Sequence, residues 1–327
     1  MKDNRKPLVT VLIPVYNRPE IIKTVKSILD QTYTNLEVLI VDNASTDSTV
    51  ETIKKIVDKR IRLIINEKNM GQTYSLNRGL KEAKGKYIAR IDSDDIALPR
   101  RIEKQVSFLE ENPDYVLVGS WVRFIDDNDR LGMVVKMPTT DEGLRIMNTV
   151  SCGMYHPSAM YRTCIIRDNK IEYNPIIHMA ADYDLWVKLM KYGKACNLAE
   201  PLIYYRRGNN NDSRHYEDLM WKESTAVRRK VIKELETSKN EKKQILKIIN
   251  IESKEKKSLK ESVWVHNFYM KYLNSHIDSA SQDYYILKQH FLIKCYGSCF
   301  ANNSARYAGF VRKIYVLAKA LKNKIGG

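Results

Sequence analysis

The chain has 327 residues, a formal net charge of +16 at pH 7, and a composition that is 43% hydrophobic and 29% charged. These values are typical of a globular protein with one large domain, or a core domain and an appendage, and they exclude an intrinsically disordered chain. No apolar run approaches the ~20 residues of a transmembrane helix, and the five cysteines lack the spacing of a zinc site. We therefore expect a reduced, cytoplasmic protein.

The first part of the sequence alternates short apolar runs with segments of helical periodicity. The apolarity of the runs is continuous, as in strands that are covered on both faces of a parallel sheet. This β-α-β-α-β-α-β order predicts an α/β fold with a doubly wound, mostly parallel sheet flanked by helices. Pro14 is expected to end the first strand. We predict strands at 8–13, 36–42, 61–65 and 86–91, and helices at 21–29, 47–56 and 73–83.

Three carboxylates, Asp92, Asp94 and Asp95, follow the fourth of these strands within four residues. A parallel strand that ends in acids places them at the crevice where open α/β sheets bind ligands. Asp92 and Asp94 have one residue between them, so both can face the same small volume. Two such carboxylates suit a hard divalent cation, which in turn suits a diphosphate. The alternative is a polar turn in which Asp95 caps the next helix.

The sequence has no glycine-rich loop for a dinucleotide or a nucleoside triphosphate. The first strand is followed by Pro14–Arg18 rather than by Gly-x-Gly-x-x-Gly, and no Gly-x-x-x-x-Gly-Lys occurs. Phosphate groups would therefore not be held by such a loop. A metal ion held by the carboxylates is the natural substitute.

The rest of the chain continues the alternation of predicted strands and helices, and its composition then changes. From about residue 216, Lys/Glu-rich segments with apolar residues at helical spacing follow one another and predict four or five helices. We therefore expect two domains, at 1–215 and 216–327, the second a C-terminal helical appendage. Within the first domain we further predict helices at 100–111, 141–149 and 182–189, strands at 115–122, 156–162 and 201–205, and a mixed connection over 126–155.

The positive charge is concentrated after residue 236, and the last predicted helix, 305–324, is basic and amphipathic. Such a helix can lie on an anionic membrane surface, which would make the protein peripheral on the cytoplasmic face of the cell membrane. A helix packed on its own neighbours is the alternative, and the tail could also mediate a homo-oligomer. Nucleic acid is not expected as a partner, because the basic residues elsewhere lack the interleaved aromatic residues of a stacking platform.

Five short motifs occur in the same order as in a known enzyme family. Together they cover about residues 8–210, and the sequence resembles a family 2 glycosyltransferase with the GT-A fold. The C-terminal appendage carries none of these motifs. They are Val11–Asn17, Val41–Asp47, Asn69–Gly71, Ile91–Asp95 and Ala181–Trp186.

The resemblance implies transfer of a sugar from a UDP-sugar to a hydroxyl group, with inversion at the anomeric carbon. It assigns to Asp42, at the end of a strand, the role of accepting the N3–H of uracil, a contact that a neutral side chain would make more weakly. An acid that only caps the following turn is the alternative. The other residues implied at the nucleotide are Pro14, Val15, Tyr16, Asn17, Asn69 and Gly71.

The resemblance also implies a metal ion, Mn²⁺ or Mg²⁺, at the diphosphate. Asp94 would bind the ion directly, and Asp92 would contact the ribose or the metal ion. Ser93 would lie in the same donor site. The ion would neutralise the charge of the departing diphosphate. Many family members have a His after the last strand of the domain. This chain has Arg206 and Arg207 there, and Arg207 is the expected partner of the pyrophosphate.

Inversion requires a base that takes the proton of the attacking hydroxyl, and Asp182 matches the family position for that base. The sequence departs from the family beside it, because the usual Glu-Asp pair is Ala181-Asp182 here. A structural role of Asp182 as a helix N-cap is the alternative. His156 also matches a family position, and a structural role is equally open for it.

The sequence therefore supports two functions. The first is a metal-dependent, inverting hexosyltransferase that acts on a glycan, a lipid-linked sugar or a cell-surface polymer, as in polysaccharide biosynthesis. The alternative is a non-catalytic GT-A-fold protein that binds an anionic polymer through its basic tail, and the missing Glu beside Asp182 favours it. Turnover of a UDP-sugar would discriminate between the two.

Overall fold

A computed structural model describes residues 6–208, 216–234, 239–240, 242–243, 246 and 259–296. The chain divides into two compact units, Met1–Val231 and Ile232–Gly327. Helix α9 (Glu217–Glu234) is the first helix after the proposed domain boundary at 215, and most of it lies in the first unit. The basic helix predicted at 305–324 lies outside the described residues.

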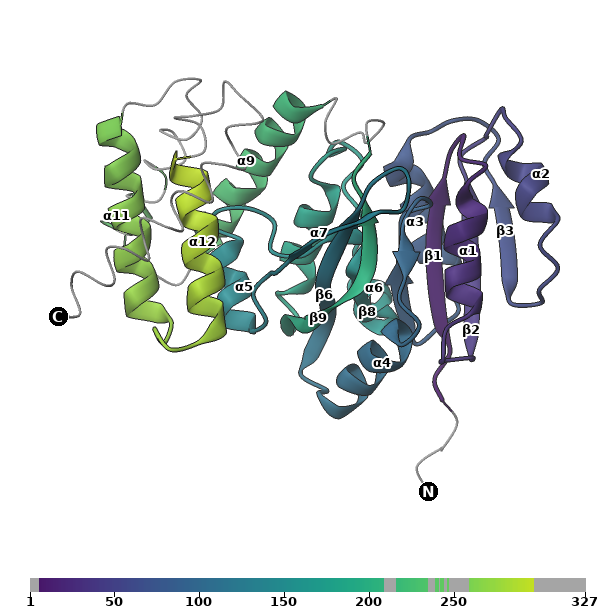
Figure 1. Ribbon diagram of the computed structural model, residues 1–327, viewed down its shortest axis with the longest axis horizontal. Helices are drawn as coiled ribbons and strands as arrows, with labels where there is room; N and C mark the ends of the chain where they lie inside the picture. Colours follow the sequence, from purple (N-terminus) through teal and green to yellow (C-terminus); the bar gives the residue numbers. More distant parts are fainter. Residues whose placement is uncertain are drawn as a thin grey trace. The chain divides into compact units, whose positions relative to one another are not determined.

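Nine strands of the described chain form one mixed sheet, which lies in the first unit (Figure 1). Every strand that we predicted there is present, and two further short strands, β5 and β7 in the list below, were not predicted. The strands are β1 (Val9–Val15), β2 (Leu36–Asp42), β3 (Ile61–Ile65), β4 (Tyr87–Arg90), β5 (Ile96–Ala97), β6 (Tyr115–Ile125), β7 (Leu131–Val135), β8 (Met160–Arg162) and β9 (Lys194–Arg206).

The strand order in the sheet is β3-β2-β1-β4-β8-β6-β9-β5, with β7 paired to β6. β3, β2, β1 and β4 are parallel neighbours, as their continuous apolarity predicts. The direction changes at β8, which is antiparallel to both β4 and β6, whereas β6 and β9 are parallel. The sheet confirms the predicted α/β class and mixes parallel with antiparallel pairs.

β1 does not end at Pro14, as we expected from the sequence, but continues to Val15. The pairing of β1 with β4 stops at Leu12, opposite Arg90, whereas the pairing with β2 continues to Val15. Val15 accepts a hydrogen bond from the β2 side, so in the alternating strand Pro14 faces the β4 side, beyond the end of that ladder. The missing N–H of Pro14 therefore costs no ladder hydrogen bond.

The helices of the first unit pack on both faces of the sheet. Alternate residues of β1 enter two separate cores: Val11 and Ile13 belong to one, and Leu12 belongs to the other. The helices in addition to α9 are α1 (Ile21–Leu29), α2 (Thr49–Lys54), α3 (Gln72–Glu82), α4 (Arg101–Glu111), α5 (Asp141–Met147), a 3₁₀ helix (His156–Ser158), α6 (Thr163–Asp168) and α7 (Ala181–Leu189).

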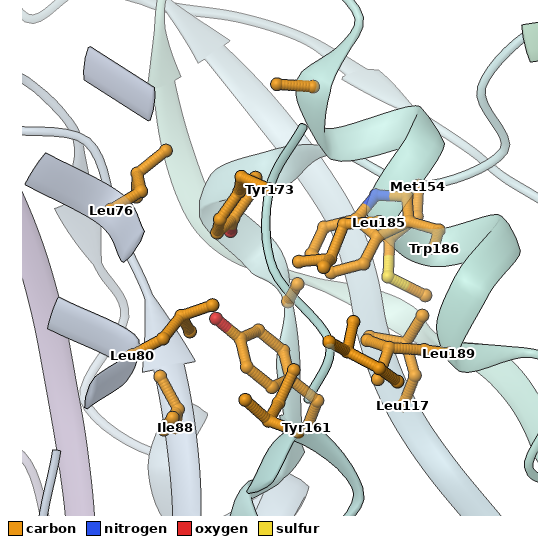
Figure 2. Packing of buried hydrophobic residues seen from close by; sticks show 14 of the residues in the cluster. Leu76, Leu80, Ile88, Leu117, Met154, Tyr161, Tyr173, Leu185, Trp186 and Leu189 are labelled. Atoms are coloured by element: carbon orange, nitrogen blue, oxygen red, sulfur yellow. The ribbon is translucent and has the colours of Figure 1, made fainter. Parts of the chain in front are cut away.

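Figure 2 shows the core that contains Leu12. Leu76 and Leu80 of α3 lie on one side of it, and Trp186 and Leu189 of α7 lie on the other. The Trp186 side chain is fully buried, and truncation of such a side chain to Ala typically costs about 3–5 kcal/mol. This core therefore fixes α7, the helix that carries the candidate base, against the sheet.

The described part of the second unit contains α11 (Leu259–His276) and α12 (Gln282–Tyr296), so the predicted helical appendage is present. The rings of Tyr269 and Phe291 stack at 4.5 Å between centroids, and the hydroxyl of Tyr284 donates to Asn274 Oδ1 (2.8 Å). These contacts join the two helices as a hairpin. Among the described residues, none of the helices combines the length and apolarity that crossing a membrane requires.

The close packing of β1 and β4 leads to a first prediction. A Cβ atom at Gly85 would lie 2.4 Å from the backbone N of Thr10 and 2.7 Å from the backbone O of Tyr87. Gly85→Ala should destabilise the protein by about 1–3 kcal/mol, because overpacking against backbone cannot be relieved by a rotamer change. Urea unfolding followed by circular dichroism measures this. Gly132→Ala, where the nearest atom lies at 3.3 Å, is the control, and equal stability of Gly85→Ala and wild type would contradict the prediction.

Candidate active site

The loops that follow β1 and β2 are held together by hydrogen bonds. The backbone N–H of Asn17 donates to Ser45 Oγ (2.9 Å), and Asn17 Oδ1 accepts from the N–H of Thr46 (2.8 Å). Asn17 has φ 47°, a left-handed conformation that Asn adopts more readily than most residues. Of the other residues predicted in this loop, Pro14 and Val15 end β1, and Tyr16 is 43% exposed.

Asp42 is fully buried at the end of β2, opposite Val15 in the sheet. Its two carboxylate oxygens accept from the backbone N–H (2.9 Å) and from the hydroxyl (2.5 Å) of Ser45. Asp42 therefore accepts hydrogen bonds within the turn that follows β2, as the alternative interpretation of the sequence predicted. A carboxylate has about four lone-pair positions, so acceptor capacity remains for a base, and the contact with uracil stays a prediction.

A chain of asparagines lies beside Asp42. Asn43 Nδ2 donates to Asn69 Oδ1 (2.7 Å), and Asn43 Oδ1 accepts from Asn66 Nδ2 (3.0 Å) and from the N–H of Met70 (3.1 Å). Asn69 Oδ1 also accepts from the N–H of Gly71 (3.0 Å), which has φ 84°. The structure thus brings the predicted Asn69 and Gly71 together with Asn43 and Asn66, which sequence reasoning missed. Their signal was a polar residue at the end of each of two apolar strands, β2 and β3.

The three acids after β4 occupy different environments. Asp92 is 27% exposed and forms an ion pair of 2.5 Å with Arg90, whose side chain is 1% exposed. Asp94 is half-buried, as is Ser93 between the two acids. Asp95 is buried, and its Oδ1 accepts from the backbone N–H of Arg206 (2.7 Å). The alternative that Asp95 caps a helix is wrong, because α4 begins at Arg101 and Arg100 is its N-cap.

Crowding raises the pKa of two of these acids. Burial raises the pKa of Asp94, the charge of Asp92 raises it further, and Arg18 opposes both effects. Burial also raises the pKa of Asp95 well above its usual value, with added repulsion from Asp92 and Asp94. The loop therefore holds more negative charge than the adjacent cations neutralise, and a bound cation would relieve the repulsion.

This donor set fits a divalent cation that is shared with a substrate. Among the described residues, no group of three or more His, Cys, Asp and Glu side chains has the arrangement of a metal site. Mg²⁺ in nucleotide sites is typically held by one or two carboxylates, with phosphate oxygens and water as the remaining ligands. Asp92 and Asp94 match that pattern, in which the protein supplies only part of the coordination shell.

Asp182 is the second residue of α7, and Ala180 is the N-cap. The alternative that Asp182 caps the helix is therefore wrong. Its Oδ1 accepts from the backbone N–H of Tyr183 (2.8 Å). Burial raises the pKa of Asp182 from 3.8 to about 6, Arg90 lowers it and Asp92 raises it. The acid on α7 and the acids after β4 are thus close enough to act on one another electrostatically.

Arg90 is a residue of the candidate site that sequence reasoning passed over. It lies within the apolar β4, and its charge lowers the pKa of both Asp182 and His156. His156 Nε2 lies 2.8 Å from the hydroxyl of Tyr173, and burial holds the pKa of His156 well below its usual value. His156 is therefore a neutral, packed residue. The signal for Arg90 was a charged residue between buried apolar neighbours.

The end of β9 contacts the acid loop through Arg206. Arg206 Nε donates to the carbonyl oxygen of Asp94 (2.9 Å), in addition to the backbone bond with Asp95. The guanidinium of Arg207 lies 5.2 Å from the centre of the Phe124 ring, and its backbone N–H donates to Ile125 (2.9 Å). The pairing of Arg207 with a pyrophosphate stays a prediction.

Comparison with known proteins identifies the family. The model of "Glycosyl transferase family 2" matches residues 10–169. A glycosyltransferase of Haemophilus influenzae is 34% identical over 221 residues, which is 64% of this chain and 68% of that protein. The chain belongs to glycosyltransferase family 2. It is therefore a transferase of EC class 2.4, as we expected from the sequence.

Three further similarities bear on the fold and the substrates of this glycosyltransferase. WfgD of Escherichia coli, "UDP-Glc:alpha-D-GlcNAc-diphosphoundecaprenol beta-1,3-glucosyltransferase", is 31% identical over 185 residues, which is 56% of this chain and 70% of WfgD. The structure of S. aureus TarS with UDP-GlcNAc has a TM-score of 0.60 at 21% identity and covers 82% of this chain and 81% of that chain. The mannosyltransferase PcManGT of Pyrobaculum calidifontis, with GDP-Man and Mn²⁺, has a TM-score of 0.57 at 16% identity and covers 92% and 89%. The two structures confirm the GT-A fold.

The raised pKa of Asp182 predicts that this acid reduces stability. Because the folded pKa of about 6 exceeds the ordinary 3.8, ionised Asp182 is disfavoured in the folded state. Asp182→Asn should therefore be more stable than wild type by about 3 kcal/mol at pH 7.

The sign of this effect fixes its pH dependence. The contribution of Asp182 to wild-type stability should fall as the pH rises from about 4 to about 6, the interval between the ordinary and the folded pKa of Asp182. The advantage of Asp182→Asn should thus be small below pH 4 and complete above pH 6. Thermal unfolding across this range tests it, with the exposed Asp168→Asn as control. A variant less stable than wild type at pH 7 would contradict the prediction.

Proposed function

We propose that this glycosyltransferase uses a UDP-sugar and a divalent cation, and transfers the sugar with inversion to a hydroxyl of a glycan, a lipid-linked sugar or a cell-surface polymer. The observation that carries the proposal is the juxtaposition of two acidic sites. Burial raises the pKa of Asp182 on α7, and the nearby charges of Arg90 and of Asp92, which follows β4, lower and raise that pKa respectively. A candidate base thus lies near the candidate site of the leaving group.

The loops after β1 and β2 support a nucleotide site. They are held in one conformation by Asn17, Ser45 and the asparagine chain that includes Asn69. The name of WfgD specifies UDP-Glc, and TarS binds UDP-GlcNAc, so relatives and fold neighbours both use UDP-sugars. PcManGT binds GDP-Man in the same fold. We assign UDP to this chain because Asp42 offers an anionic acceptor that suits the N3–H of uracil.

Asp92 and Asp94 would hold Mn²⁺ or Mg²⁺ at the diphosphate. A divalent ion there supplies positive charge that neutralises the departing diphosphate. The ion pair between Arg90 and Asp92 orients one of the two carboxylates, and Arg206 fixes the backbone of Asp94. The protein thus presents the two carboxylates before the substrate arrives.

Asp182 would act as the base of a single displacement. The acceptor oxygen forms a bond to the anomeric carbon, the bond from that carbon to the diphosphate oxygen breaks, and the hydroxyl proton moves to Asp182. Oδ1 of Asp182 is engaged with the backbone of Tyr183, which leaves Oδ2 for the acceptor. The raised pKa makes Asp182 a stronger base than an ordinary carboxylate.

The non-catalytic alternative is favoured by one observation, Ala181 in place of the usual Glu. It would leave UDP binding intact and give no turnover with any donor. We also propose peripheral association with an anionic membrane surface through the basic helix predicted at 305–324, which lies outside the described residues. We prefer the enzyme, because both candidate carboxylate sites are present and lie in one region.

The proposal predicts the effect of two substitutions on transfer. Asp94→Ala removes a metal ligand and Asp182→Asn removes the base, so each should lower kcat by about 10²–10⁴-fold, the usual range for a positioned acid or base. A screen of UDP-hexoses and UDP-N-acetylhexosamines for Mn²⁺-dependent UDP release identifies the donor for this assay. Asp168→Asn, at an exposed site on α6, is the control. Wild-type rates in both variants would exclude the proposed mechanism.

The proposal also predicts a pH profile. Asp182 can accept a proton only when ionised, and its pKa is raised to about 6. Transfer should therefore rise about tenfold per pH unit below pH 6 and level off above it. Initial rates at saturating donor between pH 4.5 and 8 measure this, with UDP affinity determined at each pH as the control. A rate that is constant down to pH 4.5 would rule out Asp182 as the base.

A further inference from the structure

Glu223 on α9 binds the backbone that leads into α7. Its carboxylate accepts hydrogen bonds from three consecutive N–H groups, those of His178 (3.1 and 3.0 Å to the two oxygens), Met179 (2.7 Å) and Ala180 (3.2 Å). Ala180 is the N-cap of α7, and its side chain cannot accept a hydrogen bond. The backbone that leads into α7 is therefore held by a residue from another helix.

The chemistry of this contact explains its strength. The N-terminal end of a helix exposes unpaired N–H groups and carries partial positive charge, so a carboxylate is favourable there. Hydrogen bonds to an ionised acceptor are roughly twice as strong as neutral ones. Glu223 makes several of them from one half-buried side chain. Asp182 lies only two residues after the last of these N–H groups.

α9 is itself fixed on α7, so Glu223 has a defined position. Val227 is fully buried in the core that contains Trp186. Lys230 Nζ lies 3.0 Å from Asp184 on α7, an acid that is 4% exposed. Glu223, Val227 and Lys230 follow one another at spacings of four and three residues, which places them on one face of the helix.

We propose that Glu223 is a positioning residue for Asp182, and this inference rests on the proposed role of Asp182 as the base. Position 181, where the resemblance led us to expect Glu, is Ala in this chain. Glu223 brings a carboxylate to the same turn from a helix that the sequence assigned to the appendage. Its loss would free the three N–H groups and release the turn that precedes the base. A displacement of about 1 Å at a reacting group can cost about 10² in rate.

The inference predicts a split between chemistry and donor binding. Glu223→Ala should lower kcat for transfer by about 10–100-fold, while the Kd for UDP measured by calorimetry stays within about twofold, because the UDP site lies on other loops. Glu223→Gln should recover most of the rate, since its amide oxygen can still accept from the N–H groups. Asp218→Ala is the matched control, an exposed acid on the same helix, and it should transfer like wild type.

Amide hydrogen exchange supplies a readout that does not depend on activity. The N–H groups of residues 178–180 should be protected in wild type and in Glu223→Gln, and should exchange faster in Glu223→Ala. Wild-type rates of transfer in Glu223→Ala would overturn the inference. Parallel loss of transfer and UDP binding in Glu223→Ala and Glu223→Gln would also overturn it, since that pattern indicates a role in folding alone.

The same measurements separate this inference from the proposed function. Inactive Asp182→Asn together with fully active Glu223→Ala would leave the proposed function standing and remove only the role of Glu223. Transfer by Asp182→Asn at the wild-type rate would show that Asp182 is not the base, and Glu223 would then have no catalytic residue to position. A third outcome would support both the proposed function and the role of Glu223. In it, Asp182→Asn is inactive, Glu223→Ala is slow, and Glu223→Gln transfers at close to the wild-type rate.

Discussion

The arrangement of the site depends on one buried charge, the guanidinium of Arg90. Its side chain is 1% exposed, and burial of a charge costs several kcal/mol unless a partner compensates. The partner is Asp92 at 2.5 Å. Among the described residues, Nε and Nη1 of Arg90 have no hydrogen-bond partner, so the pairing is incomplete and Arg90 is a costly residue for the fold. It is better explained by the site, because its positive charge allows several acids to lie close together there.

The position of β4 in the sheet explains why these acids meet. β4 is the last of four parallel neighbours, and β8 on its other side is antiparallel. The loops after β1, β2 and β4 therefore open at one edge of the sheet, which is where open α/β sheets bind ligands. The chain beyond β8 supplies α7 with Asp182 and the end of β9 with Arg206. The candidate donor site and the candidate base thus come from parts of the chain before and after the change of strand direction.

The sequence predicted those features that depend on local pattern. Continuous apolarity located the parallel strands, and the acids at their ends located Asp42, Asp92 and Asp94. What it missed depends on tertiary contacts. β7 is largely exposed and too short for a periodic signal. Arg90 looked like an interruption of an apolar strand, because its ion pair is visible only when the loop folds back on β4. The sequence also could not show that Arg206, rather than Arg207, contacts Asp94 and Asp95, because the register of β9 decides this.

The largest revision concerns the role of α9. Its Lys- and Glu-rich sequence is typical of a solvated helix and gave no reason to place it with the sheet. The structure instead uses Glu223, Val227 and Lys230 to hold α7. The family model ends at residue 169, before both Asp182 and Glu223. The segment that carries the candidate base is therefore supported by contacts outside the region that the family model matches.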